Sequence, residues 1–222
     1  MQQRSQRYVR RQRGWIGQGA GSQDPGGEEG VLVTEAVRKS VLRGRQRRSH
    51  FGKRLDTTSA IVGMTPDDQA WIAKSQAHIT PHIAEVAEDV YRALLSRHET
   101  AAYFTNERGA IDRAQVAMRR EAFEEWLHAV VEDPFDEGTA EFLASVGRAH
   151  ARPEGAGDRI KARYLLGTIS RVQSSFLAIL SSTIAEPAAL AACSAAWCKR
   201  LLIHLDLLLA VYGATESTAH WY

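Results

Sequence analysis

The sequence of 222 residues contains little cysteine and none of the short motifs that mark common enzyme sites. Its two cysteines, Cys193 and Cys198, lie about 140° apart around a helix axis, and such a pair does not easily form a disulfide. This usage is typical of a reducing compartment, so we expect a cytoplasmic protein. There is no Gly-rich phosphate loop, nucleophile elbow or catalytic-triad spacing, and we expect a protein that is not an enzyme.

Long apolar runs are also missing. The longest, LLIHLDLLLAVY at 201–212, is too short to span a bilayer and contains His204 and Asp206. It is typical of a helix in a protein core. At the N-terminus, no apolar run of about 7–15 residues follows the positive start, so the sequence does not predict a secretory signal.

The basic residues are unevenly distributed. Residues 1–54 carry 13 basic and 4 acidic side chains, a net charge of +9, and the remainder of the chain has a net charge of −7. With few clustered apolar side chains, residues 1–60 are expected to be a disordered basic extension. Such an arm could bind nucleic acid or an anionic membrane. The alternatives are a solvated tail, or upstream sequence that is not translated, because Met64 directly precedes the first orderly segment.

From Met64 onward, the apolar residues recur at three- and four-residue steps, which indicates helices. Apolar and polar residues do not alternate at every second position, as they would in strands, so we predict an all-α fold. The domain should cover residues 64–213, followed by a short tail at 214–222. Helices are predicted to begin at Thr65-Pro66 and Thr80-Pro81 and to cover 111–131, 139–150, 158–184 and 187–213.

One histidine stands out by its position. In VGRAHARPEG, His150 lies between two arginines at the predicted end of a helix, before a loop with proline and glycines. An imidazole there could bind a metal or haem iron while its second nitrogen donates to a backbone carbonyl. The alternative is a helix-terminal histidine favoured by the helix dipole.

Two longer segments resemble a known family. AEDVYRALLSRHETAAYF is similar to the distal helix of the sensor globins, the group of protoglobins and haem domains of globin-coupled sensors. IDRAQVAMRREAFEEWLHAVVEDPFDEGTAEFLASVGRAHAR resembles their next helix, loop and proximal helix. The resemblance covers Asp67 to Tyr212 and implies a globin-like helical fold with an extra N-terminal helix, here as a stand-alone single domain. Unlike the family, this chain has the polar loop PEGAGDRIKARY after the histidine.

The resemblance also implies a site. It places the proximal ligand of haem b at His150 and the distal tyrosine at Tyr91. Tyr91 could donate a hydrogen bond to O₂, whereas without the resemblance it would be interpreted as a core tyrosine. Three residues without hydrogen-bonding side chains should face the distal pocket, and further apolar or aromatic residues should line the cavity, although both sets also fit simple helix packing. The first set is Ala114, Ala117 and Met118; the second is Phe104, Trp126, Val146, Tyr164, Leu165 and Ile169.

The resemblance therefore predicts a globin that reversibly binds O₂, with CO or NO as further ligands, at a pentacoordinate haem iron. We expect a gas sensor that forms a homodimer through its last two helices and signals to a separate partner. Surplus apolar residues support the dimer: Leu202, Ile203, Leu207, Leu209 and Val211. The alternatives are a haem-free regulatory interaction module with a globin fold, and a haem-dependent redox enzyme acting on nitrogen oxides or peroxide.

Overall fold

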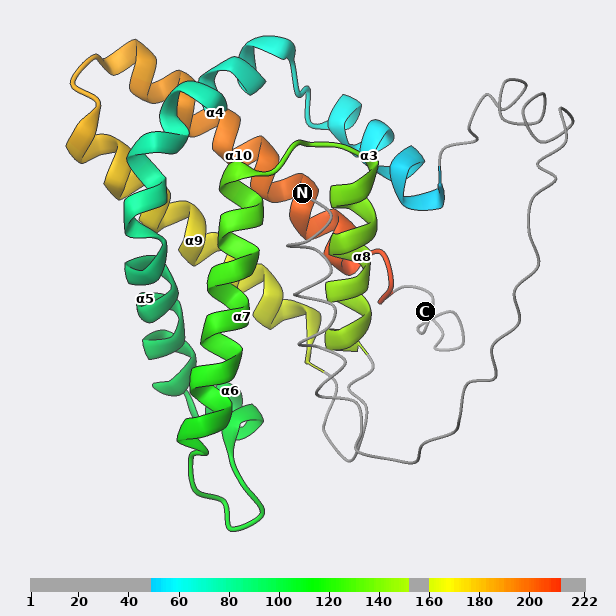
Figure 1. Ribbon diagram of the computed structural model, residues 1–222, viewed down its shortest axis with the longest axis vertical. Helices are drawn as coiled ribbons and strands as arrows, with labels where there is room; N and C mark the ends of the chain where they lie inside the picture. Colours follow the sequence, from blue (N-terminus) through cyan, green and yellow to red (C-terminus); the bar gives the residue numbers. More distant parts are fainter. Residues whose placement is uncertain (1–48, 152–159, 213–222) are drawn as a thin grey trace, which may run out of the picture.

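The computed structural model describes residues 49–151 and 160–212, and helices are the only regular elements in these ranges. This confirms the predicted all-α fold. In Figure 1, the long axes of α5, α7 and α8 run alongside one another, and α9 and α10 cross them at an angle. The elements are α3 (His50–Ile61), α4 (Pro66–Ile79), η1 (Thr80–His82), α5 (Ile83–Leu95), α6 (His98–Ala101), η2 (Ala102–Phe104), α7 (Arg113–Glu132), α8 (Glu137–Ala151), α9 (Ala162–Thr183) and α10 (Pro187–Leu209).

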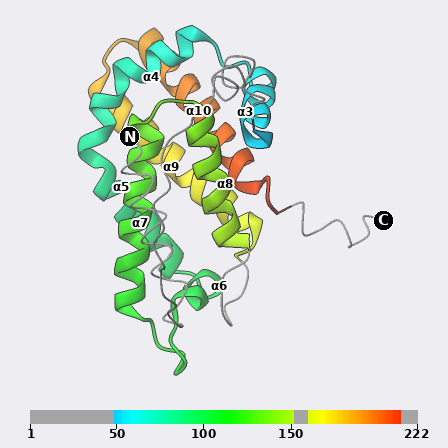
Figure 2. The ribbon, with the colours of Figure 1, turned by 45° about the vertical axis from the view of Figure 1, so that its right-hand side comes forward.

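Helix α10 is the central element of the core. It contacts α3, α4, α8 and α9, and both ribbon views show it passing through the middle of the bundle (Figures 1 and 2). By length and apolar composition alone, Pro187–Leu209 would also qualify as a membrane span, a test that core helices pass too. Its largest side chains are buried against neighbouring helices: Trp197, Leu201, Ile203, His204, Leu205, Leu207 and Leu208.

These contacts use much of the apolar surface that the sequence analysis assigned to a dimer. Ile203 and Leu207 are fully buried within the monomer, and Leu202 is 42% exposed. Leu209 and Val211 have intermediate exposure. The prediction that Ile203 and Leu207 are available for a dimer interface is therefore wrong. It assumed that α10 packs on one side only, whereas α10 has neighbouring helices on several sides.

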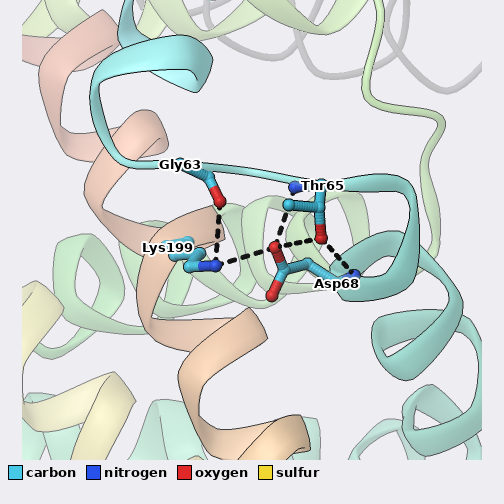
Figure 3. Close-up of polar contacts among 4 residues, drawn as sticks. All are labelled: Gly63, Thr65, Asp68 and Lys199. Carbon is cyan, nitrogen blue, oxygen red and sulfur yellow. Dashed lines mark hydrogen bonds and ion pairs between the residues drawn. The ribbon is translucent and has the colours of Figure 1, made fainter.

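Local sequence explains where α4 begins. The Thr65 hydroxyl accepts a hydrogen bond from the backbone N–H of Asp68, and the Asp68 carboxylate accepts one from the Thr65 N–H, which together form a capping box. Lys199 of α10 donates to the same carboxylate at 2.8 Å and to the carbonyl of Gly63 at 2.9 Å (Figure 3). Burial alone would raise the pKa of Asp68, but hydrogen bonds from Lys199 and Thr65 bring it below its usual value. This cluster fixes the α3–α4 corner to α10.

Helix α3 corrects the prediction of disorder for residues 50–60. Leu55 is buried, and Arg54 forms a two-bonded ion pair with Asp206 of α10, with N–O distances of 2.5 and 2.8 Å. Thr58 donates to the same carboxylate at 2.7 Å. The basic composition concealed this helix, because its arginine is paired with an aspartate far away in the sequence. Residues 1–48, which hold most of the predicted basic arm, and the predicted tail at 214–222 lie outside the described residues.

His204 lies in the apolar run that the sequence analysis assigned to a core helix, and it is fully buried. Its ring stacks on Phe135 at a centroid distance of 5.8 Å and meets Trp126 edge-on at 6.3 Å. Within the described part of the chain, neither ring nitrogen has a hydrogen-bond partner. Burial, followed by the charge of Arg200 one turn earlier, lowers the pKa of His204 well below its usual value of 6.5.

This burial predicts a dependence of stability on pH. Below pH of about 6.5 the unfolded chain protonates His204 and the folded chain does not, so the free energy of unfolding should fall by about 1.4 kcal/mol per pH unit from this residue. We expect His204→Leu to remove that contribution. Urea unfolding at pH 5.5, 6.5 and 7.5 should show that the free energy of unfolding of the variant increases relative to that of the wild type as the pH falls.

The exposed His98 provides the control, because His98→Gln should leave the pH dependence unchanged. Parallel pH profiles for the wild type and His204→Leu would contradict the interpretation.

Candidate functional site

The predicted ligand His150 lies in the last turn of α8. Its Nδ1–H donates to the backbone carbonyl of Val146 at 2.8 Å, the carbonyl one turn earlier. Burial lowers the pKa of the imidazole, the hydrogen bond to Val146 partly opposes this, and the charge of Arg119 lowers it further. The ring is therefore neutral at physiological pH, and Nε2 is left with its lone pair available to a metal.

Tyr91 is buried on α5, in an aromatic group that also involves η2 and α7. Its ring centroid lies 5.6 Å from that of Phe104 and 5.9 Å from that of Phe123. Phe123 in turn stacks on Trp126 at 5.3 Å. Three elements thus fix the orientation of the phenol.

Arg119 of α7 connects the two predicted residues. Its guanidinium lies 5.5 Å from the centre of the Phe104 ring. It interacts electrostatically with the phenol of Tyr91, and its charge acts on His150. Arg119 therefore lies within electrostatic range of both the imidazole of α8 and the phenol of α5.

The six predicted lining residues are buried or partly buried. Tyr164 packs edge-on against Tyr103 at 5.9 Å, and Arg163 donates to its hydroxyl at 3.2 Å. Leu165 is partly buried against the core. Four predicted residues are buried: Phe104, Trp126, Val146 and Ile169.

The three distal residues predicted on α7 are exposed. Ala114 and Ala117 are on the surface and Met118 is 43% exposed. At 100° per residue, both alanines lie about 140° or more around α7 from Arg119, so the structure does not bring them together with Tyr91. Their contact with a cofactor stays a prediction.

Sequence reasoning predicted Trp126 on α7 but missed Arg119 and Phe123, which lie closer to Tyr91. Arg119 and Phe123 are one turn apart, and Trp126 follows after three more residues, so the three share one face of the helix. That spacing was present in the sequence. Because arginine is charged, residue 119 would not be assigned to the interior from the sequence. The stem of an arginine can nevertheless be buried while its head interacts with an aromatic ring.

The position of α8 depends on Gly147, one residue after Val146. A Cβ at this position would lie 2.2 Å from the backbone oxygen of Leu208 and 3.0 Å from Val211 Cγ2. Only a residue without a side chain permits α8 and α10 to approach so closely. This contact fixes the proximal helix just before His150.

The fold and this site define a globin, and comparisons with known proteins agree. A family model described as Protoglobin matches residues 52–218. The chain belongs to the protoglobin family. No curated protein sequence matches it.

Solved structures support the fold. The globin domain of the Geobacter sulfurreducens globin-coupled sensor is 20% identical, with a TM-score of 0.58, and the match covers 71% of this chain and 96% of that domain. The ferric globin domain of E. coli DosC is 15% identical, with a TM-score of 0.56, and the match covers 72% and 99% of the two chains. The predicted globin-like architecture is confirmed.

Membership of a globin family implies a haem cofactor, and the donor groups present fit one. Haem iron needs a single axial imidazole from the protein, and His150 offers a neutral ring with one nitrogen already engaged. In the described ranges, no group of three or more His, Cys, Asp or Glu side chains is arranged to hold a bare metal ion.

We expect Gly147→Ala to destabilise the protein by about 1–3 kcal/mol, because the nearest obstructing atom is a backbone oxygen of the packed helix α10 and cannot move aside freely. The displaced α8 should also weaken haem binding through His150. Chemical unfolding and haem titration measure the two effects.

Gly167 is a matched control, since it lies within α9 and a Cβ there would meet nothing within 4 Å. Gly167→Ala should stabilise the protein by about 0.5–1 kcal/mol through helix propensity. Equal effects of the two substitutions would show that packing against α10 is not limiting.

Proposed function

We propose that this chain is a cytoplasmic haem b globin that reversibly binds O₂, with CO and NO as further ligands, and acts as a gas sensor rather than an enzyme. When bound, ferrous haem supplies iron with an open sixth coordination position for a diatomic ligand. The observation that carries the proposal is the state of His150, a neutral imidazole whose Nδ1–H is donated to the Val146 carbonyl.

The hydrogen bond from His150 fixes both the tautomer and the plane of the ring. Nε2 can then bind iron without losing a proton, and the carbonyl of Val146 increases the electron density of the ring through the shared hydrogen. Gly147 supports this arrangement, because the close contact with α10 limits movement of the helix that carries the ligand.

Tyr91 supports a distal role. Its ring is held by Phe104 and Phe123 in an apolar surrounding. A phenol O–H in such a surrounding can donate a hydrogen bond to a diatomic ligand on which negative charge develops. Water competes poorly there.

The proposal is tested by adding haemin to the purified protein and recording visible spectra in the ferric, ferrous and O₂-exposed states. The wild type should show a ligated haem spectrum with a reversible change on O₂ exposure. His150→Ala should lose it, because the substitution removes the imidazole that would hold the iron.

His128→Ala is the matched control, since His128 lies on α7 and contacts Glu132 on the surface. It should retain the wild-type spectrum. A free-haem spectrum in the wild type, or the same spectrum in His150→Ala, would refute the proposal.

We further propose that the protein forms a homodimer through α9 and α10. These helices pack side by side and expose three large apolar side chains, Leu166 at 57%, Leu177 at 48% and Leu202 at 42%. Leu166 and Leu177 are eleven residues apart, about 20° around α9, so they lie on one face. An exposed apolar face on two adjacent helices is suited to a four-helix interface.

Leu166→Glu should therefore convert the dimer into a monomer of 24.6 kDa, because a carboxylate would be buried at the interface. Light scattering coupled to size-exclusion chromatography measures the mass. Ile61→Glu, at a site on α3 that is 78% exposed, should leave the dimer intact. A monomeric wild type would contradict the proposed assembly.

A further inference from the structure

We propose that Phe51 of α3 and Arg148 of α8 are positioning residues for His150. Their contact holds the last turn of α8 from the side opposite to the imidazole, so that α3 determines how strongly the imidazole binds iron. The consequence for iron rests on the proposed haem function, whereas the effect on α8 is a property of the haem-free protein. Both residues act through the backbone of α8.

The first turn of α3 is attached to the start of α8. The backbone N–H of Ser49, the N-cap residue of α3, donates to Oε1 of Glu137 at 2.6 Å. Gly52 is buried against the same side chain, since a Cβ there would lie 3.1 Å from Cδ of Glu137. The carboxylate is also favoured by the dipole of α3, because it lies at the N-terminus of that helix.

A second contact joins α3 to the last turn of α8. The guanidinium carbon of Arg148 lies 5.6 Å from the centre of the Phe51 ring, which is within the range of a cation–π interaction. The partly buried ring of Phe51 packs against the hydrophobic core, and Arg148 is exposed. The core therefore fixes the ring, and the ring restrains the arginine.

These two contacts share one face of α8. Glu137 and Arg148 are eleven residues apart, about 20° around the helix. His150 follows Arg148 by two residues, about 200° around the helix, and so lies on the opposite side. Gly147, about 100° from Arg148, contacts α10. Helices α3 and α10 thus hold α8 from two sides, and the imidazole extends from a third.

The last turn of α8 depends on this support. Among the described elements, only α3 and α10 pack extensively against α8. The ends of helices fray, and Arg148 lies in the same turn as His150. Groups that orient a metal ligand without touching the metal affect the strength of its binding. A contact that limits fraying of this turn therefore supports the bond from His150 to iron.

The first test measures amide hydrogen exchange at residues 147–151 of the full-length, haem-free protein. Phe51→Leu keeps an apolar side chain without the aromatic ring, and Arg148→Gln removes the cation. Each should speed exchange in this turn by about two- to fivefold, which corresponds to the loss of an exposed cation–π interaction. Arg148→Lys keeps a cation and should recover part of the protection.

The second test uses the ferrous, haem-loaded protein and measures the iron–histidine stretching band by resonance Raman spectroscopy. Phe51→Leu and Arg148→Gln should each shift the band to lower frequency and speed haem transfer to an acceptor globin by about two- to fivefold. The double variant should resemble the more affected single variant, because both residues act through one contact.

Lys199→Met is the matched control for stability. It removes the ion pair with Asp68, which joins α4 to α10 and does not involve α8. The free energy of unfolding should fall, with no change in exchange at residues 147–151 or in the iron–histidine band. Lys53→Gln removes an exposed cation of α3 and controls for charge.

The outcomes separate this inference from the proposed function. A wild type that does not ligate haem would overturn the proposed function, and the exchange experiment would still decide whether α3 positions α8. Unchanged exchange in Phe51→Leu and Arg148→Gln would overturn the positioning role. Faster exchange with an unchanged iron–histidine band would overturn the effect on iron. Equal changes in Lys199→Met would show that lost stability, rather than the α3–α8 contact, is the cause.

Discussion

The close approach of α8 to α10 at Gly147 is the constraint on which the site depends. The backbone oxygen of Leu208 occupies the space where any side chain at position 147 would begin. Because α10 also contacts α3, α4 and α9, the position of α8 is fixed relative to the whole core. His150 lies three residues later on the same helix, so its position is fixed as well. Its hydrogen bond to Val146 fixes the rotation of the imidazole ring.

Two polar clusters hold the N-terminal helices against the same central helix. Asp206 accepts hydrogen bonds from Arg54 and Thr58 of α3, and Lys199 binds Asp68 at the start of α4. Both are partly buried, where removal of one partner would leave a charge with poor access to water. Helix α3 also contacts α8, so it supports the helix that carries His150 as well as α10.

Much of the helical architecture could be predicted from the sequence because it depends on local signals. Thr65-Pro66 and Glu186-Pro187 each supply a capping side chain and a proline at the first helical position, and α4 and α10 begin there. Helix α3 was missed because its stability comes from Leu55 in the core and from Asp206, which no local pattern reveals. The full burial of His204 depends in the same way on side chains far away in the sequence, Trp126 and Phe135.

The sequence predicted two principal residues of the candidate site through the family resemblance, His150 and Tyr91. Their roles towards a cofactor stay predictions. The resemblance did not give Arg119, whose guanidinium lies over the ring of Phe104 in η2. The predicted distal residues of α7 illustrate the limit, because a helix register carried over by resemblance says little about side-chain exposure when the identity to solved relatives is 20% or less.

The central place of α10 also affects the order in which the protein can form during synthesis. Arg54 and Asp206 are 152 residues apart, and Lys199 is 131 residues from Asp68. Because a ribosome releases the chain from the N-terminus, α3, α4 and α8 emerge before the helix that they pack against. The nascent chain must therefore expose their apolar faces until α10 has been translated, and closure of the core is a late, long-range step that helper chaperones can act on.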